Sequence, residues 1–254
     1  MHIETLGKGP DLVLIHGWAM HGGVFAPLTR LLRERFRLHI VDLPGHGYSR
    51  DDATTLDPAQ CAQHLLAVLP RAVWLGWSFG GLIALHAALA QPGAVRGLAV
   101  IAASPCFVTA SDWPHGVAVA TFAGFDAGLR RDYRATINRF LALETMGSDG
   151  ALAELRELRA HVFERGEPAL VALEQGLRVL ETADLRMRLP QLAMPSLWIA
   201  GRRDRLVPAA ALRWATRHCP QSHFVEIASG HAPFVAHAAE TAKSLIDFTG
   251  SLPA

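Results

Sequence analysis

The sequence contains little lysine, few cysteines and no long hydrophobic run. Lys8 and Lys243 are its only lysines, and lysine and arginine together number 24 against 23 acidic residues, for a formal net charge of +1. This balance lacks the positive excess that favours nucleic acids or anionic membrane surfaces, so we expect no nucleic-acid and no membrane partner. The longest apolar stretch, residues 81–90, is broken by His86 and is too short to cross a bilayer.

Cysteine is equally sparse. Cys61, Cys106 and Cys219 are scattered and odd in number, which argues against a disulfide framework and fits no metal-ligand spacing. We therefore expect no metal and no other cofactor. The first residues, Met1 to Thr5, have none of the features of a signal peptide, so we expect a cytoplasmic protein. The sequence does not report an oligomeric state, and our working expectation is a monomer.

What the chain does contain is an interrupted α/β pattern. Half of its 254 residues are hydrophobic, which suits a buried parallel sheet. Strand and helix signals alternate over residues 1–107, and the strand–loop–helix pattern returns over residues 189–254. We predict an α/β fold with a mostly parallel central sheet flanked by helices, in which these two segments form the core and residues 108–188 form an insert before the late strands.

The insert is predicted to be a helical cap. Apolar residues recur at helical spacing over residues 130–145, 152–165 and 168–180, and no strand pattern is visible there. Pro168 suits the first turn of the third helix.

Ser78 lies in the most informative motif of the chain. The apolar run at residues 72–75 predicts a buried strand, and it leads directly into Gly76-Trp77-Ser78-Phe79-Gly80-Gly81, after which residues 82–90 favour a helix. This arrangement is typical of a nucleophile elbow, a turn so tight that its flanking residues must be small. The N-terminus of the following helix favours negative charge at the turn. Ser78 is therefore our candidate nucleophile.

A serine nucleophile needs a base and an orienting acid, which follow an elbow in the order Asp, His. Residues 196–200 predict a strand that ends in the loop carrying Asp204, and residues 223–227 predict one that leads to His231. Reactive groups gather at the carboxyl ends of strands in an open α/β sheet. We therefore expect both side chains to meet Ser78.

Each residue then has a chemical role. His231 would accept the proton of Ser78 and return one to the leaving alcohol, while Asp204 would fix the imidazole tautomer and stabilise the imidazolium. Asp126 and Asp184 are rival acids, but neither directly follows a predicted strand. We interpret both as surface or helix-cap residues.

Two backbone N–H groups are predicted to form an oxyanion hole. One belongs to Phe79, the residue after the nucleophile, and the other to Trp18, which follows the apolar strand at residues 12–15. Gly17 permits the turn that aims this N–H group inward. The two donors would hold the negative oxygen of a tetrahedral intermediate, and losing one typically costs about 3–4 kcal/mol. We expect His16 to brace the loop and not to touch substrate.

Together these motifs resemble the α/β-hydrolase superfamily. They follow its order across almost the whole chain: His16-Gly17-Trp18, Asp42-Leu43-Pro44-Gly45-His46-Gly47-Tyr48-Ser49, Gly76 to Gly81, Gly201 to Pro208, and Gly230-His231-Ala232-Pro233. The resemblance implies an α/β-hydrolase fold whose helical cap covers the active site and sets the substrate. It leaves that substrate open.

One cap segment resembles a narrower family, the pimeloyl-[acyl-carrier protein] methyl ester esterases of biotin synthesis. Residues 139–147 are similar to a stretch that lines the substrate pocket in that family, with Glu144 where glutamine is usual. Segments 16–20, 75–78 and 180–186 are also similar to it. The resemblance implies substrate contacts from Trp18, Ser78, Phe79, Phe140, Leu141, Ala142, Leu143, Glu144 and His231.

The family reaction implies an acyl-carrier protein as partner. Hydrolysis of the pimeloyl methyl ester releases methanol and leaves a free carboxylate on the carrier-bound chain. Because carrier proteins are acidic, Arg134, Arg139, Arg156 and Arg159 on the predicted cap helices are candidate docking residues. The alternative is a solvated, salt-bridged helix face, since acids balance arginines over the insert and Glu154 and Glu157 lie among the second pair.

Three functions stay open on this sequence. The first is the carrier-protein methyl ester esterase. The second is a broad carboxylesterase, or a hydrolase of a carbon–carbon bond next to a ketone, on the same triad. The third is a non-enzymatic binding protein of the same fold, which the complete set of triad and oxyanion residues argues against.

Overall fold

The fold is built on a seven-stranded sheet in the order β1-β3-β2-β4-β5-β6-β7. The computed structural model describes residues 1–146 and 150–253. Only the β1–β3 pair is antiparallel, and every other neighbouring pair is parallel. The strands are β1 His2–Gly7, β2 Asp11–Ile15, β3 Arg37–Asp42, β4 Ala72–Trp77, β5 Val95–Ile101, β6 Ser196–Gly201 and β7 Ser222–Ile227.

The strands explain why the sheet could be predicted. All of β4 and β6 and nearly all of β2 and β3 are buried, as continuous apolar runs covered on both faces should be. The predicted mostly parallel α/β fold is therefore confirmed. The strand β1 was not predicted, because its half-exposed alternation with polar residues is a weak signal in six residues.

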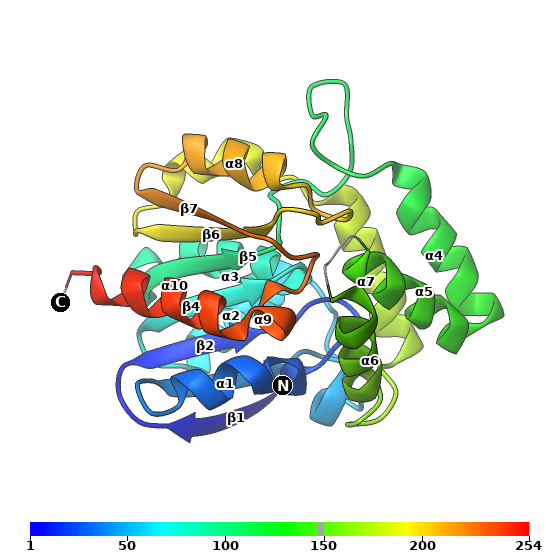
Figure 1. Cartoon of the computed structure of the whole chain (residues 1–254), viewed down its shortest axis with the longest axis horizontal. Coiled ribbons are helices and arrows are strands. Elements are labelled where there is room, and N and C mark those ends of the chain that lie inside the picture. Colours follow the sequence, from blue (N-terminus) through cyan, green and yellow to red (C-terminus); the bar gives the residue numbers. More distant parts are fainter. Residues whose placement is uncertain (147–149, 254) are drawn as a thin grey trace.

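Helices cover both faces of the sheet (Figure 1). The helices α1 and α10 pack together on one face, α2 and α3 pack together on the other, and α8 lies against β6 and β7. These helices are α1 Ala26–Leu32, α2 Pro58–Val68, α3 Phe79–Ala90, α8 Ala209–His218, α9 Pro233–Ala236 and α10 Ala238–Gly250. Short 3₁₀ helices span Gly22–Phe25, Gly47–Ser49, Pro92–Ala94 and Arg186–Gln191.

Between β5 and β6, the described part of the chain contains four α-helices, which we call the cap helices. They are α4 Val119–Arg131, α5 Tyr133–Thr145, α6 Ala151–Val162 and α7 Leu170–Thr182, and they lie together at one end of the sheet, at the right of Figure 1. The division of the chain at residues 107 and 188 stays a prediction.

Two details of the predicted cap were wrong. The helix expected at 130–145 is in fact the end of α4 and the whole of α5, because Asp132 ends one helix and caps the next by accepting a hydrogen bond from the N–H of Ala135 at 3.0 Å. Arg130 and Arg131 therefore belong to α4. Pro168 precedes its helix instead of occupying the first turn, since α7 begins at Leu170.

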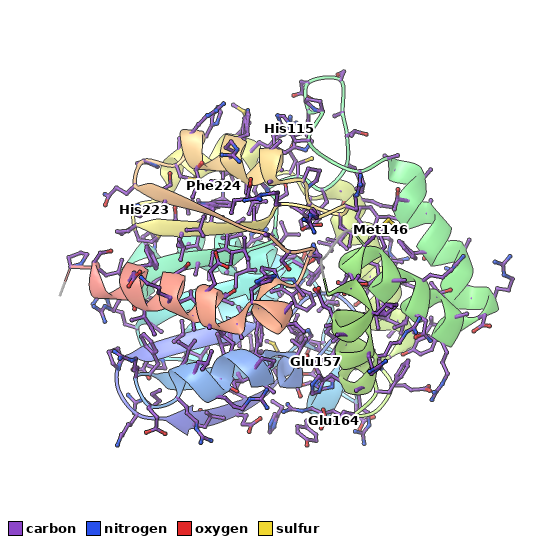
Figure 2. All side chains as sticks on the ribbon, in the orientation of Figure 1. His115, Met146, Glu157, Glu164, His223 and Phe224 are labelled. Carbon is purple, nitrogen blue, oxygen red and sulfur yellow. The ribbon has the colours of Figure 1, made fainter. Side chains whose placement is uncertain are left out.

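Side chains fill the space between the sheet and its helices (Figure 2). In that view Met146 lies at the cap end of the molecule, and His223 lies on β7 at the opposite end. The fully buried large side chains include Trp74 and Trp77 from β4 and Trp198 from β6. In the described part of the chain, no helix has both the length and the apolar character needed to span a membrane.

Candidate active site

Ser78 occupies a strained turn between β4 and α3. Its φ is 52° and its ψ is −119°, a backbone conformation that is uncommon for any residue other than glycine. A Cβ at Gly76 would fall on the carbonyl group of Gly80, and a Cβ at Gly80 would fall on the carbonyl oxygen of Ile15. The two glycines are therefore required for this turn to form beside β2, and the turn is the predicted elbow.

The structure brings the three predicted triad residues together. Nε2 of His231 lies 2.8 Å from Oγ of Ser78, and Nδ1 lies 2.7 Å from Oδ2 of Asp204. Ser78 follows β4, Asp204 follows β6 and His231 follows β7, so the three loops meet at the carboxyl ends of parallel strands. All three side chains are buried.

Asp204 and His231 are held by further hydrogen bonds. Oδ1 of Asp204 accepts from the backbone N–H groups of Leu206 and Val207 at 2.8 and 2.9 Å. Burial alone would lower the pKa of His231, but the charge of Asp204 and the hydrogen bond to it outweigh this effect and raise the pKa. The indole N–H of Trp77 donates to the carbonyl oxygen of His231 at 2.9 Å and fixes its loop.

The rival acids lie elsewhere. Asp184 accepts hydrogen bonds from the guanidinium of Arg186, and Asp126 lies 4.0 Å from Arg130 on the same helix. Each therefore has a local arginine as its partner.

The predicted oxyanion loop lies directly beside the serine. A Cβ at Gly17 would come within 3.2 Å of Cβ of Ser78, so the backbone of this loop passes against the nucleophile. Phe79 is the first residue of α3, and the N–H group at that position has no acceptor within the helix. The Trp18 side chain is engaged by the cap, because its indole N–H donates to the carbonyl oxygen of Leu173 at 2.9 Å.

A narrow apolar pocket of about 10 Å³ lies beside Ser78. Phe140, predicted from the cap motif, lines it and packs edge-on against the Trp18 ring with centroids 4.6 Å apart. Sequence reasoning missed the other lining residues, which are Phe107, Phe122, Leu180 and Leu206. Leu206 lies two residues after Asp204 and Phe107 lies in the loop after β5, so proximity to strand ends could have indicated both.

Other residues of the cap motif face a different cavity. Ala142 and Leu143 line a groove of about 410 Å³ on the surface of α4 and α5, together with Arg139, Met146 and three further residues. The structure does not bring these two side chains to the pocket at Ser78. Phe125 lies between the groove and the pocket. It lines the groove, and its ring packs edge-on against the ring of Phe140, with centroids 5.4 Å apart. Leu141 is fully buried, and the last motif residue, Gly147, lies outside the described residues.

Glu144 is buried next to the base. Its carbonyl oxygen accepts a hydrogen bond from the backbone N–H of His231 at 2.9 Å, and its Oε1 lies 4.0 Å from Nε2 of His231. Burial raises the pKa of the Glu144 carboxyl group to about 8, an effect only partly offset by His231. The backbone of Glu144 therefore contacts the loop of the triad histidine, and its carboxyl group lies near Nε2 of that residue.

The four candidate docking arginines differ in their contacts. Arg134 pairs with Glu167 and lies over the ring of Phe163, with its guanidinium carbon 4.7 Å from the centroid. Arg139 donates to Oγ1 of Thr136 at 3.3 Å and lines the α4–α5 groove. Arg156 and Arg159 are exposed on α6. All four lie on the cap helices, two on α5 and two on α6.

The expected bracing role of His16 is visible in its hydrogen bonds. Nδ1 lies 2.7 Å from the carbonyl oxygen of Gly17, and Nε2 accepts from the backbone N–H of Leu43 at 3.0 Å. Burial lowers the pKa of His16 to about 3, so the ring is neutral. The imidazole therefore connects the oxyanion loop to the end of β3.

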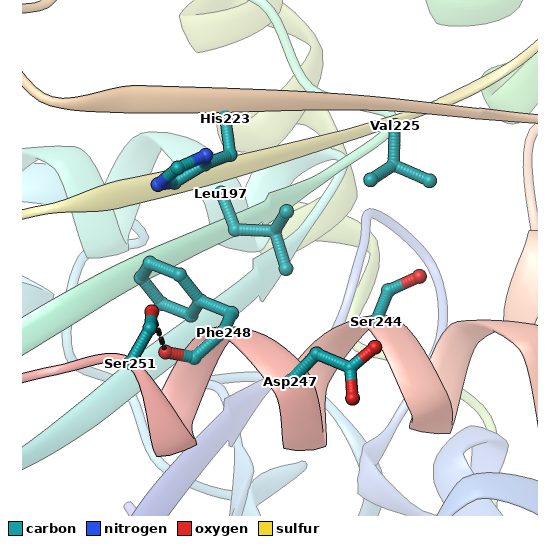
Figure 3. Close-up of a pocket in the computed structure, with 7 residues that line it drawn as sticks. All are labelled: Leu197, His223, Val225, Ser244, Asp247, Phe248 and Ser251. Atoms are coloured by element: carbon teal, nitrogen blue, oxygen red, sulfur yellow. Dashed lines mark hydrogen bonds between the residues drawn. The ribbon is translucent and has the colours of Figure 1, made fainter.

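A separate cavity lies far from these residues. It is lined by side chains of β6, β7 and α10, among them Leu197, His223 and Phe248, and contains no member of the triad (Figure 3). Asp247 is its one acidic lining residue. We therefore take the pocket at Ser78 as the candidate active site.

Comparisons with known proteins identify the family of the chain. Residues 10–238 match the family model described as "alpha/beta hydrolase fold". A curated pimeloyl-[acyl-carrier protein] methyl ester esterase of Xanthomonas oryzae pv. oryzae (strain MAFF 311018) is 56% identical over 254 residues, covering 100% of both chains. The protein of the same name from Stenotrophomonas maltophilia (strain R551-3) is 55% identical over 253 residues, covering 99% of this chain and 97% of that one.

Solved structures show the same fold at lower identity. The esterase EaEST from Exiguobacterium antarcticum has a TM-score of 0.88 at 23% identity, covering 98% of this chain and 95% of that one. The enol-lactonase from Burkholderia xenovorans LB400 has a TM-score of 0.86 at 19% identity, covering 98% and 96%. The chain therefore belongs to the α/β-hydrolase family and, within it, to the family of the pimeloyl-[acyl-carrier protein] methyl ester esterases.

Proposed function

We propose that this chain is a serine esterase that hydrolyses the methyl ester of pimeloyl-[acyl-carrier protein]. The products are methanol and the free carboxylate of the carrier-bound chain. The observation that carries the proposal is the continuous hydrogen-bonded series from Oγ of Ser78 through His231 to Asp204, beside an apolar pocket. The names of relatives at 55–56% identity support the choice of ester.

The reaction proceeds in two steps through an acyl-enzyme. Nε2 of His231 accepts the proton of Ser78 while Oγ attacks the ester carbonyl carbon, and the same proton then passes to the departing methoxide. Asp204 holds Nδ1 and stabilises the imidazolium. The N–H groups of Trp18 and Phe79 bind the oxyanion. Water then attacks the acyl-enzyme by the same route in reverse and frees Ser78.

The apolar lining of the pocket matches the chemistry of the acyl chain of this substrate. A pimeloyl chain is a run of methylene groups, and aromatic and leucine side chains bury such groups favourably, at about 0.8 kcal/mol per methylene. Phe122, Phe140 and Leu180 provide this surface from three different cap helices. A methyl ester needs little additional room at Ser78.

The decisive experiment is hydrolysis of the pimeloyl-[acyl-carrier protein] methyl ester by the native protein and by Ser78→Ala. We expect release of methanol by the native protein and none by the variant, with the variant still folded by circular dichroism. Failure of the native protein on this substrate, together with cleavage of short p-nitrophenyl esters, would favour the broad carboxylesterase instead.

Carrier-protein docking is a second part of the proposal. Arg139 lies at the α4–α5 groove and Arg156 is exposed on α6, so both can meet acidic groups of a carrier or the phosphate of its prosthetic arm. We expect Arg139→Glu and Arg156→Glu to raise the KM for the carrier-bound ester about tenfold and to leave hydrolysis of a p-nitrophenyl ester unchanged. Arg217→Glu, exposed on α8, is the matched control. An unchanged KM at physiological salt would contradict this docking surface.

A further inference from the structure

Glu144 is a buried acid at the active site that the two-step mechanism does not use. Its side chain is 1% exposed, and its Oε1 lies 4.0 Å from Nε2 of His231, the nitrogen that faces Ser78. In the part of the chain that the structure describes, Oε2 has no hydrogen-bond partner. A buried polar atom without a partner costs free energy unless something else satisfies it during function.

The distance between Oε1 of Glu144 and Nε2 of His231 suits a single oxygen atom that hydrogen-bonds to both. An oxygen that hydrogen-bonds two groups at about 2.8 Å each, at a roughly tetrahedral angle, holds them about 4.5 Å apart. The gap of 4.0 Å between Oε1 and Nε2 is close to this span. In each half of an ester hydrolysis one oxygen must occupy the position next to Nε2, because that nitrogen gives up or accepts a proton there.

The two acids beside His231 have opposite surroundings. Asp204 accepts hydrogen bonds from two backbone N–H groups and lies at Nδ1, whereas Oε2 of Glu144 accepts none and the carboxyl lies towards Nε2. The charges that act on Glu144 come from His231, from Asp204 on the loop after β6, and from Glu154 on α6. Burial is the largest effect and raises the pKa of Glu144 to about 8, so its carboxyl group carries a proton near neutral pH. When two acids at one site have contrasting environments, one commonly stays ionised while the other keeps its proton.

We propose that Glu144 is an additional catalytic residue, whose protonated carboxyl group holds, together with Nε2 of His231, the oxygen that exchanges a proton in each half-reaction. This inference rests on the esterase function proposed above. In acylation the bond from Oγ of Ser78 to the carbonyl carbon forms, the bond to the alkoxide breaks, and the Nε2 proton passes to the alkoxide while Glu144 donates a hydrogen bond to the same oxygen.

In deacylation that oxygen belongs to water. Nε2 takes a proton from the water as the new carbon–oxygen bond forms, and the carbonyl oxygen of the Glu144 carboxyl group accepts the second water hydrogen. The bond to Oγ of Ser78 then breaks, and Oγ receives the proton from Nε2. Glu144 keeps its own proton throughout, so the protons balance without it.

The test compares Glu144→Gln and Glu144→Leu in pre-steady-state hydrolysis of p-nitrophenyl butyrate. The p-nitrophenolate leaves without needing a proton, so the initial burst reports acylation and the steady state reports attack by water. We expect Glu144→Leu to slow the steady state about 30-fold and the burst less than threefold, so that a burst close to one product per site accumulates. Glu144→Gln, whose amide keeps a donor and an acceptor, should slow the steady state only about threefold.

The pH profile gives an independent result. Methyl butyrate forms the same acyl-enzyme but releases an alkoxide that needs a proton. Its hydrolysis by the native protein should therefore fall as the pH rises through about 8, where Glu144 can no longer donate, and the fall should be absent in Glu144→Gln. Thr145→Val, which changes the neighbouring buried residue on α5, controls for disturbance of that helical turn. Equal slowing of burst and steady state in Glu144→Leu, no slowing of either, or an unchanged pH profile in Glu144→Gln would each overturn the inference. Hydrolysis that survives in Ser78→Ala would instead overturn the proposed function itself.

Discussion

The backbone N–H of His231 donates a hydrogen bond of 2.9 Å to the carbonyl oxygen of Glu144, so the loop of the triad histidine is joined directly to the cap helix α5. The contact is close on both sides, because a Cβ at Gly230 would lie 2.6 Å from that same carbonyl oxygen. The position of His231 therefore depends on how the cap lies against the core. Glycine at position 230 permits this approach.

We predict that Gly230→Ala lowers kcat by about 10- to 100-fold, because the methyl group must push His231 and α5 apart and small misplacements of a base are costly. The measurement is kcat on a p-nitrophenyl ester, alongside the melting temperature. Gly93→Ala is the matched control, since a Cβ at Gly93 meets nothing within 4 Å. Equal activity of the two variants would show that the cap contact does not position His231.

The orienting acid can be tested with a similar pair of variants. We predict that Asp204→Asn lowers kcat by about 10⁴-fold with little change in stability, because the amide leaves His231 in the wrong tautomer. Asp126→Asn alters a partly exposed acid whose partner is Arg130, and it should leave kcat unchanged. A loss below tenfold in Asp204→Asn, or a comparable loss in Asp126→Asn, would mean that the acid has been assigned incorrectly.

The sequence predicted the core of the site because Ser78 and Asp204 follow strands with unambiguous apolar runs, and His231 follows a mixed strand later in the chain. Ser78 was additionally marked by the spacing of Gly76 and Gly80, whose absent side chains are a steric requirement of the turn. These signals are local, and the meeting of the three loops follows from the parallel sheet. The catalytic roles stay predictions until the variants are measured.

The cap was less predictable, because its residues act through packing with distant segments. The family resemblance implied substrate contacts from Phe140, Ala142 and Leu143 alike. Helical geometry places Ala142 about 200° round the helix from Phe140, and the structure has Ala142 and Leu143 at another groove. Helical periodicity also missed the break at Asp132, whose side chain caps α5. No helix was predicted over residues 119–129, so Phe122, which lies on α4 and lines the pocket at Ser78, was not indicated.

We predict that two buried histidines make the stability of the fold sensitive to acid. Burial lowers the pKa of His16 to about 3 and that of His46 to about 4. The unfolded chain, with ordinary histidine pKa values near 6.5, therefore binds more protons than the folded one below that pH. Stability should fall as the pH drops from about 6.5 towards 4, by about 1.4 kcal/mol per pH unit for each histidine.

Urea unfolding at several pH values checks this prediction. The free energy of unfolding should change less steeply with pH between pH 6 and 4.5 in His46→Gln than in the native protein. Nε2 of His46 has no hydrogen-bond partner among the described residues, so the substitution removes no such bond at that atom. A native slope near zero in that interval would mean that the rings gain protons in the folded state.

Arg165 lies in the segment after α6 and forms an ion pair with Asp42, a buried acid of the core. Its guanidinium lies 3.2 Å from Oδ2 of Asp42, a side chain with no exposure, and 3.0 Å from Oε2 of Glu4. Asp42 also accepts hydrogen bonds from the backbone N–H groups of Gly22 and Tyr48. Although burial raises the pKa of Asp42, these partners together lower it, so the carboxylate is charged and depends on them.

We predict that Arg165→Met destabilises the protein by about 3 kcal/mol, because it leaves a buried carboxylate without its cationic partner. Arg213→Met is the matched control: Arg213 also pairs with an acid, Glu226, and lies over an aromatic ring, but its side chain is 48% exposed. The control should cost about 0–1 kcal/mol. The free energy of unfolding in urea measures both, and equal losses in the two variants would mean that burial of Asp42 adds nothing to the pair with Arg165. A larger loss of unfolding free energy in Arg165→Met would show that the ion pair with Asp42 fixes the segment after α6 to the sheet.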